Sequence, residues 1–195
     1  MPKLLPILLF ALLPAFTQAR PAISLVDAAR SQVGVTLYYD PAYKKLAYPG
    51  GDVALERGVC TDVVVRAYRK LGVDLQQLVH QDMVKAWGAY PHAQKWQLKK
   101  PDTNIDHRRV PNLATFFARH GTTVPPSKAG RDYLPGDVVT WRLPGNLTHI
   151  GIVGDKPSQA GVPQMIHNIG GGAQEEDMLF KYEITGHYRW QPPMP

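Results

Sequence analysis

RGVCTDVVVRAY, the stretch at residues 57–68, holds Cys60, the only cysteine of the chain. Apolar residues recur at helical spacing from Val59 to Leu71 and stop before Gly72, a residue type that commonly ends helices. The thiol therefore falls in the first turn of a predicted helix. Unpaired backbone N–H groups and the positive end of the helix dipole favour a thiolate at that position. On this basis Cys60 is the candidate nucleophile of the protein.

The start of the chain has the pattern of a secretory signal peptide over residues 1–19. Lys3 supplies the positive charge, residues 4–16 form an apolar run, and residues 17–19 offer a small-residue cleavage site. The run is too short to span a bilayer. We expect a secreted protein, located in the periplasm, with no transmembrane segment after signal removal. In an oxidising compartment an unpartnered cysteine is a free thiol or an intermolecular bridge, unless it is a buried apolar residue.

Length and charge limit the domain count and the class of partner. Residues 20–195 suffice for one domain with its own core. The net charge of +6 suits an anionic envelope polymer or a membrane surface. The sequence contains neither a nucleic-acid recognition motif nor a helix rich in Lys and Arg, so nucleic acid is not an expected partner. The oligomeric state is left open.

The hydrophobic period changes along the chain from helical to strand-like. Ser24 and Asp27 resemble a capping box that opens a helix, which is predicted to stop at Gly34. The other predicted helices cover residues 59–71, 75–87 and 111–120. Alternating apolar residues predict strands at 137–143, 149–154, 164–169 and 181–190. Helices followed by antiparallel strands indicate an α+β fold.

Two histidines lie on neighbouring predicted strands. His149 opens one strand and His167 lies inside the next. Because both positions are odd, antiparallel pairing places both side chains on one face of the sheet. One imidazole then acts as the base for Cys60, and a second group behind it holds its orientation and tautomer. Asn168 is an alternative orienting group, although its parity directs it to the opposite face.

A metal site is the alternative use of these histidines. Four positions are candidates for such a site: His107, His149, His167 and His187. The sequence contains no H-E-x-x-H motif and no closely spaced pair of ligands. We therefore expect neither a metal nor another cofactor.

Several blocks of the sequence together resemble a group of known enzymes. They are GG at 50–51, GVCTDVVV at 58–65, LGV at 71–73, PGDVVTW at 135–141, HIGIV at 149–153 and MIH at 165–167. In this order and spacing they resemble the NlpC-type, papain-like cell-wall cysteine peptidases. With NIDHRR at 104–109 and HNIG at 167–170, nearly all of residues 20–195 resembles the bacterial domain-of-unknown-function family 1287.

The resemblance to the peptidases implies a papain-like α+β fold, in which the nucleophile begins a helix that packs on a small antiparallel sheet. It implies that Cys60 is the nucleophile, His149 the base and His167 the third, orienting residue. It also implies hydrolysis of amide bonds in peptidoglycan peptides, typically next to D-glutamate and a diamino acid.

The sequence departs from the pattern of the peptidases beside the nucleophile. Where they usually carry Asp-Cys-Ser-Gly, residues 59–62 read Val-Cys-Thr-Asp. The Asp62 carboxylate either raises the pKa of the thiol or binds a cationic group of the substrate. A tyrosine before the Gly-Gly pair often contributes to the oxyanion site in that family, and Tyr48 is the nearest match, displaced by one position. The backbone N–H of Cys60 is the other candidate donor.

Residues 102–109 have no counterpart in the broader group of peptidases. Arg108 and Arg109 are candidates for bidentate binding of substrate carboxylates. The alternative is a structural loop in which Asp106 pairs with an arginine.

These observations predict an exported cysteine hydrolase, an amidase or endopeptidase, acting on peptidoglycan or another envelope peptide or acyl substrate through an acyl-enzyme. Acyl transfer, in which an amine rather than water resolves the acyl-enzyme, would use the same Cys60–His149 pair. The alternative from another class is a non-catalytic envelope-binding module. The presence of both residues disfavours that alternative.

Overall fold

The computed structural model describes residues 23–91 and 98–192. The predicted signal peptide at residues 1–19 lies outside these ranges. The helices are α1 (Leu25–Arg30), α2 (Cys60–Lys70), α3 (Leu75–Lys85) and α5 (Val110–His120), with short 3₁₀ turns η1 (Trp87–Ala89), η2 (Asp106–Arg108), η3 (Gly130–Asp132) and η4 (Pro144–Asn146). Within the described part of the chain, no helix has the length and apolarity needed to cross a membrane.

The strands form one antiparallel sheet and one small separate pair. The sheet has the order β3-β8-β4-β5-β6-β7. Its strands are β3 (Thr122–Thr123), β4 (Val138–Leu143), β5 (Leu147–Pro157), β6 (Pro163–Asn168), β7 (Ala173–Glu176) and β8 (Glu183–Arg189). The separate pair joins β1 (Tyr38–Tyr39) to β2 (Arg57–Gly58) in parallel. The predicted α+β class with a small antiparallel sheet is confirmed.

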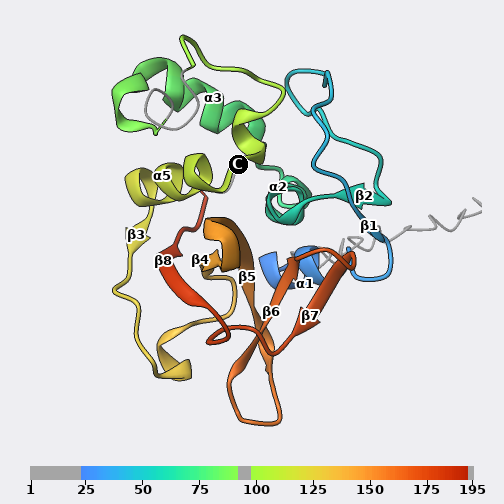
Figure 1. Cartoon of the computed structure of the whole chain (residues 1–195), viewed down its shortest axis with the longest axis vertical. Coiled ribbons are helices and arrows are strands. Elements are labelled where there is room, and N and C mark those ends of the chain that lie inside the picture. The colour runs from blue at the N-terminus through green and yellow to red at the C-terminus, as the bar shows by residue number, and fades with distance from the viewer. Residues whose placement is uncertain (1–22, 92–97, 193–195) are drawn as a thin grey trace, which may run out of the picture.

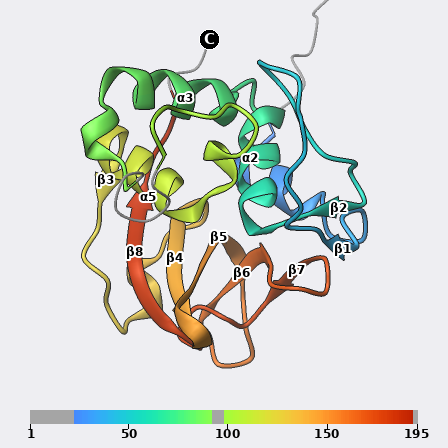
Figure 2. The same cartoon turned by 45° about the horizontal axis from the view of Figure 1, so that its top comes forward.

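Helix α2 packs on β5 and β6 of the sheet and has α1 and α3 as neighbouring helices (Figures 1 and 2). Each of its residues from Cys60 to Tyr68 is buried. Its valines belong to the same apolar cluster as Ile150, Ile152 and Ile166, which project from one face of β5 and β6. Helix α3 packs on α2, α5 and η2 (Figure 1). The start of α2 is therefore held against β5 by the main core of the domain.

The other face of the sheet carries a second, smaller core. Val139, Trp141, Val153 and Met165 pack there against a cluster that includes Tyr133. Residues of odd number thus face this second core, whereas the even-numbered isoleucines face α2, as the period of two requires.

Most element boundaries agree with the predictions, and the differences are local. The first helix ends at Arg30 and continues as turns to residue 35, where Gly34 has a φ of 78°. The third ends at Lys85, before the separate turn η1. Strand β7 and the short strands β1, β2 and β3 were not predicted, because they lack the length that makes a periodic pattern visible.

Candidate active site around Cys60

Cys60 is the first residue of α2, as the sequence predicts. Val59 precedes the helix in an extended conformation, and its side chain has no atom that can cap the helix. Asp62 forms the other half of a capping box, because its Oδ2 accepts the Val59 N–H at 2.7 Å. The unusual aspartate two residues after the cysteine therefore holds the start of the helix in place.

The environment of Cys60 differs from the expected thiolate site. The residue is 3% exposed, and burial raises the pKa of its thiol to about 12. The neighbouring backbone N–H of Ile150 lowers the pKa of the thiol, while the Asp62 carboxylate raises it. Desolvation therefore has a larger effect on the thiol pKa than the helix start has. Removing a thiolate from water costs more free energy than the partial positive charges at a helix N-terminus recover. The thiol of the resting structure is protonated at neutral pH.

Tyr39 lies beside the thiol, although the sequence analysis did not single it out. Partial burial, the neighbouring Cys60 sulfur and the Asp62 carboxylate raise the pKa of its hydroxyl to about 12. The pairing of β1 with β2 explains this position, because Tyr39 is opposite Gly58, two residues before Cys60. The resemblance had directed attention to Tyr48 instead. Tyr48 packs edge-on against His80, with ring centroids 5.1 Å apart, and does not line the cavity at Cys60.

The cavity at Cys60 has a volume of about 320 Å³. Tyr39, Arg109 and Thr148 are among the residues that line it. The thiol therefore borders a space that can admit a ligand, even though little of its own surface is exposed.

His149 and His167 are neighbours on one face of the sheet, as their parity predicts. The Nε2 of His149 lies 3.0 Å from the Nδ1 of His167 in a hydrogen bond. The Nε2 of His167 lies 3.1 Å from Oε1 of Glu176 on β7, a residue that the sequence analysis missed together with its strand. Burial lowers the pKa of His149 to about 3 and also lowers that of His167. The His149 imidazole is therefore neutral at pH 7.

Gly151 makes room for this pair. A Cβ at that position would lie 3.0 Å from the His167 Cβ and 3.1 Å from the Ile166 carbonyl oxygen. Both contacts are tighter than ordinary side chains accept, so the glycine allows β5 and β6 to bring the two imidazoles together.

The Cys60 sulfur lies near the backbone segment that carries His149, but the two side chains are not hydrogen-bonded to each other. The sulfur contacts the amide of Ile150, the residue directly after His149. The His149 ring faces the second core, with its centroid 5.8 Å from that of Trp141. Because Nε2 is occupied by His167, Nδ1 is the nitrogen left for the thiol.

Asn168 projects from β6 and connects it to the start of α2. Its Nδ2 donates to the Gly58 carbonyl at 3.1 Å, and its Oδ1 accepts the Gly170 N–H at 3.1 Å. Both polar groups are therefore used in holding the segment that leads into Cys60.

Arg108 and Asp62 form a buried bidentate ion pair. The Nε and Nη2 of Arg108 each donate to one Asp62 oxygen at 2.9 Å. Their side chains are only 1% and 4% exposed. Arg108 also donates to the carbonyls of Ala42 and Asp40. These contacts occupy the guanidinium of Arg108 and the carboxylate of Asp62, the two groups that the sequence analysis considered for binding substrate.

Arg109 pairs with Asp106 at 3.0 Å, which is the structural pairing that the sequence analysis offered as an alternative. The Arg109 side chain is 19% exposed and lines the cavity at Cys60.

Of the four histidines considered for a metal site, only His149 and His167 lie side by side. His107 lies in η2, while the Nε2 of His187 lies 2.7 Å from Asp137. Among the residues that the structure describes, no three His, Cys, Asp or Glu side chains are grouped as metal ligands would be.

Comparison with known proteins places the chain in a family. Residues 26–190 match the family model described as Domain of unknown function (DUF1287), and the chain belongs to this family. This confirms the narrower of the two resemblances found in the sequence. The chain is also similar to the uncharacterized protein YijF of Escherichia coli (strain K12), with 59% identity over 173 residues. The match covers 89% of this chain and 83% of that protein.

Proposed function

We propose that this protein is an exported cysteine hydrolase that cleaves amide bonds in cell-envelope peptides, with peptidoglycan as the expected substrate. Cys60 is the nucleophile, His149 the base and His167 the residue that orients it, in a papain-like arrangement. The observation that carries the proposal is the position of the sulfur. Cys60 begins α2 and borders a cavity, and its sulfur lies against the amide next to His149. The Nε2 of His149 is already held by His167.

The charge states favour general-base attack over a preformed thiolate. The thiol and the His149 imidazole are both neutral at pH 7. As the sulfur bonds to the substrate carbonyl carbon, its proton passes to Nδ1 of His149. The same proton then goes to the leaving amine when the C–N bond breaks. Water attacks the resulting thioester, gives a proton to His149 and releases the acid and the thiol. The reaction requires the sulfur and Nδ1 to come into contact when substrate binds, because the His149 ring of the resting structure faces the second core.

Two donors are placed to stabilise the oxyanion. One is the backbone N–H of Cys60 at the helix start, and the other is the Tyr39 hydroxyl, which lies beside the sulfur in the same cavity. Loss of one such donor commonly costs about 3–4 kcal/mol of transition-state stabilisation.

A non-catalytic envelope-binding module is the second candidate. The observations that favour it are the buried, protonated thiol and the lack of a hydrogen bond between Cys60 and His149 among the described residues. In such a module the cavity would bind a ligand without cleaving it.

Digestion of purified peptidoglycan tests both candidates. The protein is expressed as the full chain, purified and incubated with peptidoglycan, and the products are identified by mass spectrometry. The Cys60→Ser variant is the matched control, and added glycine amide reveals acyl transfer as a conjugate. A new peptide or amide cleavage that requires Cys60 supports the hydrolase. Binding to peptidoglycan without any Cys60-dependent product supports the module.

A further inference from the structure

A second, larger cavity adjoins the one at Cys60. Its volume is about 740 Å³, within the range of about 300–1,000 Å³ common for ligand sites. Four residues line both cavities: Val110, Pro111, Asn146 and Thr148. The two cavities therefore form one cleft with the thiol towards one end.

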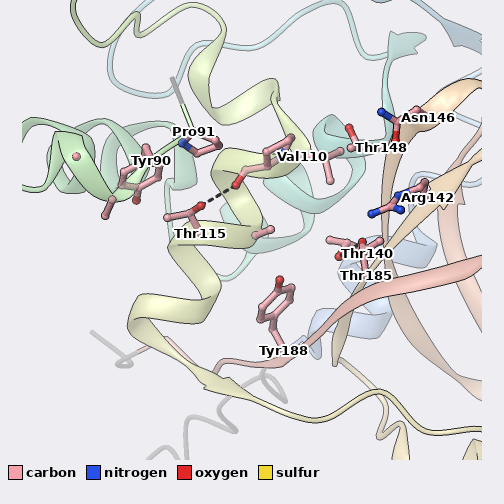
Figure 3. A pocket seen from close by; sticks show the side chains of 14 residues that line it. Tyr90, Pro91, Val110, Thr115, Thr140, Arg142, Asn146, Thr148, Thr185 and Tyr188 are labelled. Atoms are coloured by element: carbon pink, nitrogen blue, oxygen red, sulfur yellow. Dashed lines mark hydrogen bonds between the residues drawn. The ribbon is translucent and has the colours of Figure 1, made fainter. Parts of the chain in front are cut away.

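The two walls of the larger cavity differ in chemistry (Figure 3). The wall formed by α5 and residues 88–91, which follow α3, contributes mainly apolar groups, such as Val110 and Pro91. The wall formed by the sheet carries hydroxyl groups. The Oγ1 atoms of Thr140 and Thr185 are 3.0 Å apart, and Tyr188 also lines this wall. These hydroxyls offer neutral hydrogen bonds to a polar ligand.

Among the described residues that line this cavity, Arg142 is the only charged one. Figure 3 shows its side chain extending from β4 towards the space between the sheet and α5. Its ion-pair partner is Glu183, at 3.5 Å, and the two side chains are 54% and 61% exposed. An exposed pair of this kind contributes little free energy. A ligand carboxylate can therefore compete with Glu183 for the guanidinium, which matches carboxylate geometry.

We propose that the larger cavity is a carboxylate-binding subsite for an extended peptide, with Arg142 as the residue that binds the anion. This inference rests on the proposed function for the role of the Cys60 end. The peptide lies along the cleft, with its reacting amide at Cys60 and a free carboxylate at Arg142. The threonine hydroxyls and Tyr188 contact the polar groups between them. Arg109 stands at the Cys60 end, beside its partner Asp106.

Calorimetric binding to the Cys60→Ala variant of the full chain tests this subsite without requiring turnover. The probe is the tripeptide L-alanyl-γ-D-glutamyl-L-lysine with free carboxylates, and its matched control has both carboxylates amidated. We expect amidation to weaken binding about fivefold, as loss of an exposed charge pair would. Adding Arg142→Gln should weaken binding of the carboxylate probe by a similar factor and leave the affinity for the amidated probe unchanged. Arg142→Lys should recover part of the affinity.

Glu183→Gln is the control for charge on the same surface. It removes the competing carboxylate, so it should bind the carboxylate probe at least as tightly as the parent variant. The exposure of Arg142 means that its variants should fold, which their melting temperatures verify. Failure of the probe to bind, or equal affinity with and without Arg142, would overturn the subsite. Carboxylate-dependent binding in a protein that never cleaves peptidoglycan would support the subsite and overturn the hydrolase.

Discussion

Replacing Asp62 with Asn should destabilise the protein far more than replacing an exposed acid. The substitution leaves the Arg108 guanidinium buried, with its side chain 1% exposed, and without its counter-charge. Breaking a buried pair by removing one partner commonly costs about 3–5 kcal/mol. For a domain of this length, 1 kcal/mol lowers the melting temperature by about 2–4 °C, so we expect a decrease of about 6–20 °C. Asn retains an oxygen for the Val59 N–H, so the loss reports the Arg108 contact, in which the charge and one of the two acceptor oxygens are removed.

Urea unfolding followed by tryptophan fluorescence measures this loss as a free energy of unfolding. Glu183→Gln is the matched control, because it breaks the exposed pair with Arg142 and should cost at most about 1 kcal/mol. The double variant Asp62→Asn with Arg108→Gln should lose less unfolding free energy than the sum of the losses in the two single variants, because it leaves no buried charge without a partner. If Asp62→Asn cost no more than Glu183→Gln, or if the two losses added, the buried pair would not have the role assigned to it.

Further predictions concern the chemistry and the pH dependence. Cys60→Ser should abolish peptidoglycan hydrolysis with little change in melting temperature, and substantial residual turnover would refute the assignment of Cys60 as the nucleophile. His149→Ala should be as damaging to kcat as loss of the thiol, with His167→Ala less so; an inert His167→Ala beside a crippling Asn168→Ala would reverse the orienting role. Iodoacetamide at high pH should inactivate the enzyme and a chelator should not; activity lost to the chelator and restored by zinc would contradict the cysteine mechanism. Burial lowers the pKa of His107 to about 4, so the unfolded chain binds the proton first as the pH falls below about 6.5. Stability should therefore decrease on acidification, by about 2 kcal/mol at pH 5 from this residue, and His107→Gln should remove that part of the slope in unfolding free energy.

The sequence by itself determined the features that depend on neighbouring residues. The helix that begins at Cys60 and ends near Gly72 follows from its apolar spacing, and the helix from Val110 ends at Gly121 for the same reason. The shared face of His149 and His167 follows from the alternation of a strand. Each of these depends on a period or an end signal that a window of a few residues contains.

Tertiary structure alone decided the environment of the thiol. Tyr39 reaches Cys60 because a two-residue parallel pair joins β1 to β2, and so short a pair has no readable period. Arg108 meets Asp62 across 46 positions of sequence, which turned two candidate substrate-binding groups into a buried structural pair. Burial then raised the pKa of Cys60 against the pull of the helix start. Desolvation sums the contributions of every group packed around an atom, and those groups come from distant parts of the chain, so no local pattern contains it.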